Sequence, residues 1–272
     1  MIDLELLKGY YPYQLRENPD YHRYMIKEYI QLMVLDYLAT TSYIRKLVFI
    51  GGTNLRLVKG IDRFSEDLDF DCKDLSKDEF MKMTDDIFVF LRNSGFRVEA
   101  RDRENNKLKA FRRNIYFPEL LFDLGLSGYK QERFLIKVES QDQEYEYQPQ
   151  IINISRNGFF FPFPVPPDTI LCAMKISALL SRQKGRDFYD TIFLLSLTDP
   201  DYKYLAIKQD IHNSKELKEA LIKVTSSVDL TQKNIDFEHL LFNKLQGGRI
   251  LHFNQFIKTH FNSLKPQKGH SL

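Results

Sequence analysis

Two aspartates separated by one residue are the first candidates for chemistry in this sequence. Asp67 and Asp69 lie in the run DLDFDC, which is typical of a strand. Side chains two positions apart on a strand point to the same face, so the two carboxylates would project together. Their repulsion is about 4 kcal/mol at a separation of about 4 Å and an effective dielectric constant of about 20, which favours a shared divalent cation. We therefore predict that Asp67 and Asp69 bind Mg²⁺.

A glycine turn comes shortly before these aspartates. The apolar run KLVFI predicts a buried strand that ends at Gly51 and Gly52, and TNLRLVKG then predicts a short helix. Glycine lets backbone N–H groups approach a phosphate, while the Thr53 hydroxyl and the helix N-terminus add further donors. A double glycine is often a plain turn and a D-x-D pair an exposed loop, but their close succession favours a nucleotide-binding site. We assign Arg63 and Ser65 to the same site.

The segment GGTNLRLVKGIDRFSEDLDFD resembles the signature of the AbiEii/AbiGii-type toxins, a branch of the nucleotidyltransferase superfamily with the polymerase-β-like fold. In that superfamily the glycine turn holds a nucleoside triphosphate (NTP) and the D-x-D pair binds Mg²⁺. The matching positions are Gly51, Gly52, Thr53, Asp67 and Asp69. The common form has serine after the first glycine, whereas Gly52 and Thr53 occupy that turn here. Which hydroxyl contacts phosphate is therefore open.

A second block of matching residues follows a proline-rich stretch. Lys175 lies among apolar residues in ILCAMKISALL, and because burial of an unpaired ammonium is costly, it needs an anionic partner or a path to the surface. Its partner would be a phosphate or a carboxylate of RDFYD, in which Asp187 and Asp190 share a helix face. The resemblance implies that Lys175 contacts triphosphate and that one of these aspartates completes the site. The other could pair with Arg182 or Arg186.

The resemblance also implies a later strand with an acidic residue. Glu139, at the end of LIKVE, fits this place, and Asp123 in LLFDLGL is the alternative. In related transferases a third acidic residue helps to deprotonate the attacking hydroxyl, which is the role of a general base. The competing interpretation of Glu139 is an exposed glutamate at a strand end.

Seven basic residues lie between positions 97 and 113. A solvated sheet face is the favoured interpretation, and contact with the phosphate backbone of an RNA substrate is the functional one. These residues are Arg97, Arg101, Arg103, Lys107, Lys109, Arg112 and Arg113. The histidines and cysteines show no metal-ligand spacing and the sequence has no P-loop, so we expect neither a zinc site nor a Walker-type NTPase.

The elements that must position these residues can be predicted from apolar spacing and capping residues. Residues 22–40 have the spacing of an amphipathic helix. A second helix should begin after Ser76, which forms a capping-box pattern with Glu79, and end at Gly95. From 97 to 141, strand-like runs that include LLFDLGL predict an antiparallel continuation of the sheet.

The proline-rich stretch 159–167 must be extended and predicts a linker or domain edge. Asp168 would then cap the first of several helices. We therefore expect an α/β (α+β) fold, with a nucleotidyltransferase-type mixed sheet, flanking helices and a helical C-terminal region. The expected divisions are a core at 1–165, a helical region at 166–264 that contributes its lysine and aspartate motifs to the site, and a disordered tail at 265–272.

The composition argues against several classes of protein. The 272 residues include 39 Lys and Arg against 37 Asp and Glu, a formal net charge of +2, so any nucleic-acid contact must be local. Only Cys72 and Cys172 supply thiols, and the N-terminus lacks a signal segment, which argues against secretion. No apolar run approaches the length of a membrane span, so we expect a cytoplasmic protein.

These observations lead to one favoured function. We expect a Mg²⁺-dependent nucleotidyltransferase that moves a nucleoside monophosphate from an NTP to a hydroxyl and releases pyrophosphate. The family resemblance implies the toxin of a bacterial toxin–antitoxin or abortive-infection pair, with tRNA or another RNA as acceptor and a separately encoded antitoxin as partner. The alternative is a catalytically inactive nucleotide- or protein-binding module of the same fold, and a metal-dependent nuclease ranks last.

Overall fold

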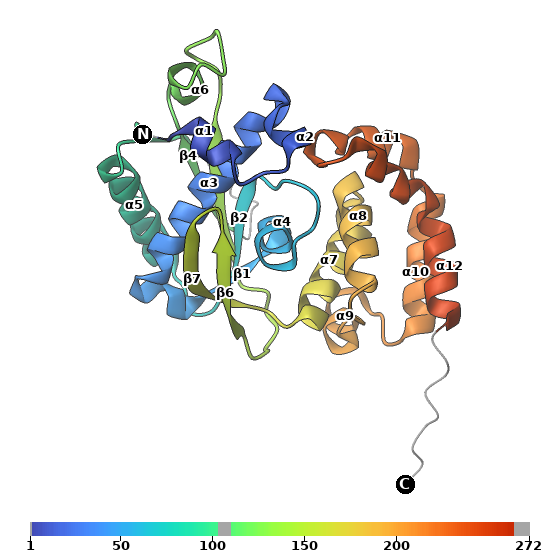
Figure 1. Cartoon of the computed structure of the whole chain (residues 1–272). Coiled ribbons are helices and arrows are strands. Elements are labelled where there is room, and N and C mark those ends of the chain that lie inside the picture. Colours follow the sequence, from blue (N-terminus) through green and yellow to red (C-terminus); the bar gives the residue numbers. More distant parts are fainter. Residues whose placement is uncertain (1, 103–109, 264–272) are drawn as a thin grey trace. The chain divides into compact units, whose positions relative to one another are not determined.

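A mixed five-stranded sheet in the order β1-β2-β5-β4-β3 forms the centre of the first of two compact units, Met1–Pro166, in this computed structural model (Figure 1). The structure describes residues 2–102 and 110–263. β2 and β5 are parallel, whereas the other neighbouring strands are antiparallel. The strands are β1 (Leu47–Ile50), β2 (Asp67–Cys72), β3 (Glu99–Ala100), β4 (Phe111–Tyr116) and β5 (Leu135–Gln141).

Alternation along the strands gives this sheet an apolar and a polar face. Leu68, Phe70 and Val138 are buried, while Asp67 and Asp69 on the opposite face of β2 are half-buried. The ring of Phe70 packs against those of Phe49 on β1 and Phe163 on a separate two-stranded ribbon. The apolar face is therefore core, and the polar face carries the candidate chemistry.

The two long helices predicted in this unit are confirmed. α3 (Pro19–Ala39) and α5 (Lys77–Asn93) contact each other through the stacked rings of Tyr37 and Phe90, whose centroids are 4.4 Å apart. α5 begins with the predicted capping box of Ser76 and Glu79. Shorter helical segments are α1 (Leu4–Lys8), α2 (Tyr13–Arg16), η1 (Ser42–Lys46), α4 (Gly51–Asn54), the π-helix η2 (Leu55–Lys59) and α6 (Leu120–Asp123).

Three sequence predictions about this unit need correction. LLFDLGL forms the helix α6, because a short apolar run does not distinguish helix from strand. The proline-rich stretch is extended, but most of it is the strand β7 (Phe159–Val165) paired with β6 (Gln150–Arg156) and not a linker, and the boundary between the two units follows at Pro166. Proline is tolerated there because a two-stranded ribbon has edges that need no N–H donor. β5 pairs parallel to β2, because the intervening chain provides the crossover that parallel pairing requires.

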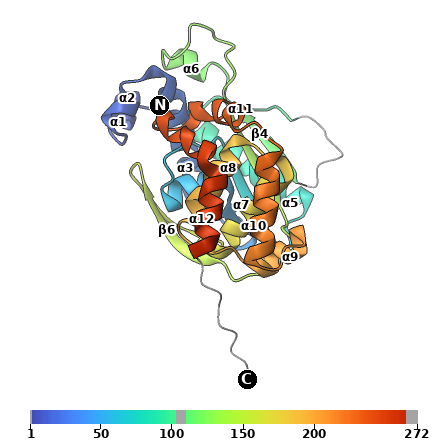
Figure 2. The same ribbon diagram turned by 90° about the vertical axis from the view of Figure 1, so that its right-hand side faces the viewer.

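Helices make up the described part of the second unit, Pro167–Leu272. They include α7 (Asp168–Arg182), α8 (Gly185–Leu195), α9 (Tyr202–Gln209), α10 (Ser214–Ser226), α11 (Leu230–Ile235) and α12 (Phe253–Ser263). α10 and α12 lie side by side (Figure 2) and are joined by a 2.7 Å hydrogen bond from Lys218 Nζ to Asn262 Oδ1.

Two details of this unit differ from expectation. Asp168 is the first residue of α7 and does not occupy the N-cap position, which is taken by Pro167. FEHLLFNKL forms turns of 3₁₀-helix, η3 (Glu238–Leu240) and the start of η4 (Lys244–His252), where adjacent glycines lower α-helical propensity. Across 2–102 and 110–263 no helix is both long and apolar enough to span a bilayer. The predicted tail at 265–272 lies outside the described residues.

Candidate active site

Strand register brings three predicted carboxylates to the polar face of the sheet. In the parallel pair β2–β5, Asp67 lies opposite Lys137 and Asp69 lies opposite Glu139. Arg112 of β4 lies opposite Glu139 on the other side. Residues in register on neighbouring strands share a face, so Asp67, Asp69 and Glu139 all project from this surface.

Ion pairs connect this row across three strands. Lys137 Nζ lies 3.1 Å from Asp67 Oδ2 and 3.6 Å from Glu139 Oε1, and Arg112 Nε lies 2.7 Å from the same Glu139 oxygen. The Asp67 and Glu139 side chains are each 23% exposed, so the row is open to solvent. Sequence reasoning did not identify Lys137 as part of this site. The alternation of β5 contained the signal, because Lys137 precedes Glu139 by two residues.

The glycine turn lies directly against this carboxylate row. Gly51 has a φ of +82°, and a Cβ atom built on it would lie 2.1 Å from Asp69 Oδ2. A Cβ atom on Gly52 would lie 2.6 Å from Ser65 Oγ and 2.9 Å from an Arg63 guanidinium nitrogen. Gly51 therefore requires glycine, because its φ is positive and a Cβ atom would meet the Asp69 side chain, whereas a Cβ atom on Gly52 would displace the side chains of Ser65 and Arg63. The structure brings Gly51, Gly52, Arg63, Ser65 and Asp69 together.

The hydroxyl of Thr53 has a structural partner. Thr53 is fully buried and its Oγ1 donates a hydrogen bond to the Asp67 carbonyl oxygen. This bond joins the glycine turn to the start of β2. The Arg63 side chain is also fully buried, and its Nη1 donates to the Phe64 carbonyl oxygen at 2.9 Å. Both residues therefore shape the turn from inside the fold.

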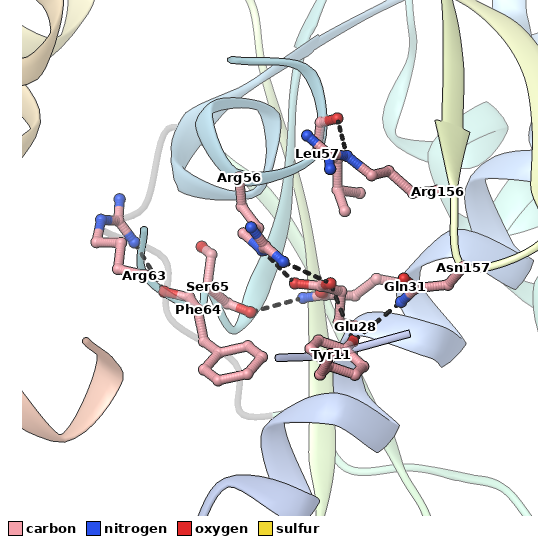
Figure 3. Close-up of polar contacts among 10 residues, drawn as sticks. All are labelled: Tyr11, Glu28, Gln31, Arg56, Leu57, Arg63, Phe64, Ser65, Arg156 and Asn157. Atoms are coloured by element: carbon pink, nitrogen blue, oxygen red, sulfur yellow. Dashed lines mark hydrogen bonds and ion pairs between the residues drawn. The ribbon is translucent and has the colours of Figure 1, made fainter. Parts of the chain in front are cut away.

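A buried polar network holds the segment between the turn and β2 (Figure 3). Arg56 of the π-helix η2 donates from Nε to Glu28 of α3 at 2.8 Å, and the Tyr11 hydroxyl donates to the same carboxylate at 3.0 Å. Asn157 donates to the Tyr11 hydroxyl at 2.9 Å. Burial and the Glu28 carboxylate raise the pKa of Tyr11 well above its ordinary value. No sequence pattern indicated this network, because its members lie on separate elements.

A hydrogen bond from α3 reaches the loop that carries Ser65. Gln31 Nε2 of α3 donates to the Ser65 carbonyl oxygen at 3.2 Å (Figure 3). π-helical turns occur mostly within α-helices and often at functional sites, and η2 follows α4 without a break. The segment from Gly51 to Ser65 is thus held by hydrogen bonds at Thr53, Arg56 and Ser65.

The predicted lysine and aspartates of the second unit form their own buried cluster. Lys175 Nζ of α7 lies 2.9 Å from Asp190 Oδ2 of α8, and Lys175 is 6% exposed. Asp187 accepts two hydrogen bonds from the Arg182 guanidinium, at 2.7 and 2.9 Å, and a third from the Lys184 backbone N–H. Asp187 therefore stabilises the start of α8, and Asp190 is the aspartate paired with Lys175.

The remaining candidates lie elsewhere. Asp123 is in α6, where its carboxylate lies 2.5 Å from Arg97 Nη2. Arg113 pairs with Asp85 and Asp102, and Arg101 covers the Tyr116 ring at 3.7 Å from its centroid. The other basic residues predicted in this region, Arg103, Lys107 and Lys109, lie outside the described residues.

The donor set at the carboxylate row suits Mg²⁺ bound together with a nucleotide. Mg²⁺ prefers oxygen donors and is usually held by one or two carboxylates plus substrate phosphates, and Asp67 and Asp69 supply such a pair on one strand face. Within the described ranges, no three acidic, histidine or cysteine side chains converge on a common metal position. Glu139, held by Arg112 and Lys137, is thus a neighbour of the pair.

Comparisons with known proteins identify a family and similar folds. A family model described as nucleotidyl transferase AbiEii toxin of a type IV toxin–antitoxin system matches residues 34–265. The fold is similar to MenT4, a nucleotidyltransferase toxin from Mycobacterium tuberculosis, with 17% identity, a TM-score of 0.63 and coverage of 98% of this chain and 91% of that one. JHP933 from Helicobacter pylori is also similar, with 18% identity, a TM-score of 0.52 and coverage of 89% and 93%. A search of the curated proteins finds no match.

Proposed function

The chain belongs to the AbiEii nucleotidyl transferase toxin family of type IV toxin–antitoxin systems, and on this basis we propose that it transfers a nucleoside monophosphate from an NTP to a hydroxyl of an RNA acceptor such as tRNA. The proposed cofactor is Mg²⁺, and the proposed partner in the cell is a separately encoded antitoxin. The observation that carries the proposal is the close approach of the Gly51 backbone to Asp69. This contact supports the proposal because it brings the glycine turn next to an aspartate that we propose as a metal ligand.

The proposed reaction is a displacement at the α-phosphorus of the NTP. A bond forms between the acceptor hydroxyl oxygen and the α-phosphorus, the bond to the bridging oxygen of the β-phosphate breaks, and pyrophosphate leaves. Mg²⁺, when bound, neutralises negative charge on the phosphates. Asp67 and Asp69 are the proposed ligands, and the backbone N–H groups at Gly51 and Gly52 are the proposed donors to the triphosphate.

The proton of the acceptor hydroxyl must also be removed. Glu139 is the proposed base, because it neighbours Asp69 in the register and lies on the same face. Arg112 and Lys137 contact its carboxylate at 2.7 and 3.6 Å and hold it on this face. The roles of Lys175 and Asp190 in triphosphate binding are proposed on the family resemblance, together with their mutual ion pair.

The experiment that tests this function is a label-transfer assay. Purified protein is incubated with Mg²⁺, each NTP labelled at the α-phosphate in turn, and total bacterial tRNA, and the RNA is resolved on a denaturing gel. Label in RNA of undiminished length supports the proposal and names the NTP. Shortened RNA without label indicates a nuclease. Tight NTP binding by calorimetry without label or pyrophosphate release indicates an inactive binding module.

A further inference from the structure

A lysine occupies the position between two carboxylates at the candidate metal site. Lys137 Nζ contacts Asp67 at 3.1 Å and Glu139 at 3.6 Å, and its side chain is 28% exposed. The ammonium therefore provides positive charge at the carboxylate that the proposed function assigns to Mg²⁺. Partial burial reduces the screening of this contact by water and salt.

The strand pairing fixes the lysine in this position. Lys137 is the register partner of Asp67 in the parallel pair, so its stem begins on the same sheet face as the carboxylate that it contacts. Two residues further along β5, Glu139 is held from the opposite side by Arg112 at 2.7 Å. Lys137 of β5 thus contacts both Asp67 and Glu139, and Arg112 of β4 contacts Glu139 as well.

We propose that Lys137 is a built-in counter-ion that stabilises the carboxylate row without metal and competes with the divalent cation for Asp67. This inference rests on the proposed function, because it concerns the same metal site. A divalent cation at Asp67 must compete with Lys137 for Oδ2 or bind the other oxygen beside the ammonium, which repels it. Metal affinity of the nucleotide-free protein is therefore lower than the aspartate pair alone would give.

Binding of Mn²⁺ alone tests the inference without any turnover. Mn²⁺ prefers the same oxygen ligands and its free fraction is measured by electron paramagnetic resonance at constant ionic strength. Lys137→Met should bind Mn²⁺ about tenfold more tightly than the wild type, because about 1.4 kcal/mol for a partly buried ion pair corresponds to this factor. Lys137→Gln provides a second neutral variant if the methionine variant fails to fold.

Three controls separate the local effect from general changes in charge. Lys137→Arg keeps the positive charge and should bind Mn²⁺ like the wild type. Lys8→Met removes the same charge from α1, where Lys8 pairs with Glu5, and should also leave the affinity unchanged. Adding Asp67→Asn to Lys137→Met should abolish the gain, which assigns the bound ion to Asp67.

Two results would overturn the inference: an unchanged or weaker affinity in both neutral variants, and no Mn²⁺ binding in any variant. The label-transfer assay distinguishes these failures from failure of the proposed function. Wild-type transfer with an unaltered Mn²⁺ affinity in Lys137→Met rejects only the counter-ion role. Absence of both transfer and metal binding rejects the nucleotidyltransferase site itself.

Discussion

Gly51 is the residue whose backbone conformation most directly shapes the candidate site. Its φ of +82° is disfavoured for residues with a side chain, and a Cβ atom there would meet Asp69. Gly51→Ala should therefore displace the Asp69 carboxylate and reduce label transfer at least about a hundredfold, the scale of a 1 Å misplacement.

Gly95 offers a matched control for this substitution. Its φ is +89°, but nothing lies within 4 Å of the position of a Cβ atom. Gly95→Ala should lower the free energy of unfolding by about 1 kcal/mol through backbone strain and leave transfer intact. Equal loss of transfer in the two variants would show that the contact with Asp69 is irrelevant.

The carboxylate of Asp67 can be tested by a change that preserves its shape. Asp67→Asn removes the charge that the proposed metal site requires, so transfer should fall at least about a hundredfold while the thermal melt stays cooperative. Asp123→Asn is the matched change at the alternative third-carboxylate position, which lies in α6 and pairs with Arg97, and it should keep full activity. Retained transfer in a folded Asp67→Asn variant would remove Asp67 from the mechanism.

At the scale of elements, α3 and the π-helix η2 are joined by a buried ion pair. The Glu28 side chain is 2% exposed and that of Arg56 is 11% exposed, so screening is weak. Glu28→Gln should lower the free energy of unfolding by about 3 kcal/mol in urea denaturation, because it leaves the Arg56 charge without this carboxylate. The double variant Glu28→Met with Arg56→Met should lower the free energy of unfolding by less than the summed losses of the single variants Glu28→Met and Arg56→Met.

The same network should influence nucleotide binding because it holds the segment that leads to Arg63 and Ser65. We expect Glu28→Gln to raise the KM for the NTP in the folded fraction.

For the stability of the same variant, a decrease in the free energy of unfolding below about 0.5 kcal/mol, the range of ordinary surface changes, would contradict the structural role of the ion pair.

The N-terminus of α5 gives a pH-dependent prediction. Hydrogen bonds from Lys46 and from the Ser76 backbone lower the pKa of Glu79 from 4.5 to about 2. A carboxyl group whose pKa is lower in the folded than in the unfolded state stabilises the fold at pH values above its unfolded pKa. This contribution declines as the pH falls from 4.5 towards 2. The difference in Tm between wild type and Glu79→Gln should therefore be largest near neutral pH and shrink at pH 3. A difference that stays constant with pH would contradict the charge-dependent cap.

Local sequence patterns predicted most of the elements around the site. The spacing of α3, the capping box of α5 and the apolar run of β1 are signals within one segment, and the structure confirms them. The short run LLFDLGL was wrongly predicted because tertiary contacts, such as the pairing of Arg97 with Glu119 and Asp123, decide its conformation.

Strand register and buried polar partners could not be predicted in the same way. The sequence suggested Glu139 by resemblance, but its position beside Asp69 depends on the parallel pairing of β2 with β5, which are far apart in the chain. Lys137 and Glu28 were overlooked for a similar reason, since their partners Asp67 and Arg56 lie on other elements. Arg182 was offered from the sequence as a partner for one of the two aspartates, and the structure identifies Asp187 as that aspartate.

At the scale of the whole molecule, the fold is shared with solved structures despite low sequence identity. Identities of 17% and 18% accompany similar folds over most of each chain, as expected when apolar pattern and topology persist while surface residues change. The small net charge of +2 means that no global basic field attracts RNA. Recognition of the proposed acceptor must therefore depend on local contacts.

The central claim, transfer of a nucleoside monophosphate, is tested most directly by the position of the label in the NTP. Parallel reactions contain the same NTP labelled at the α- or the γ-phosphate, with Mg²⁺ and total bacterial tRNA. Transfer of a nucleoside monophosphate predicts that α-label enters RNA while γ-label is released in pyrophosphate. Entry of γ-label into RNA would contradict this mechanism. So would RNA that stays intact and carries no α-label from any of the NTPs when the protein is folded.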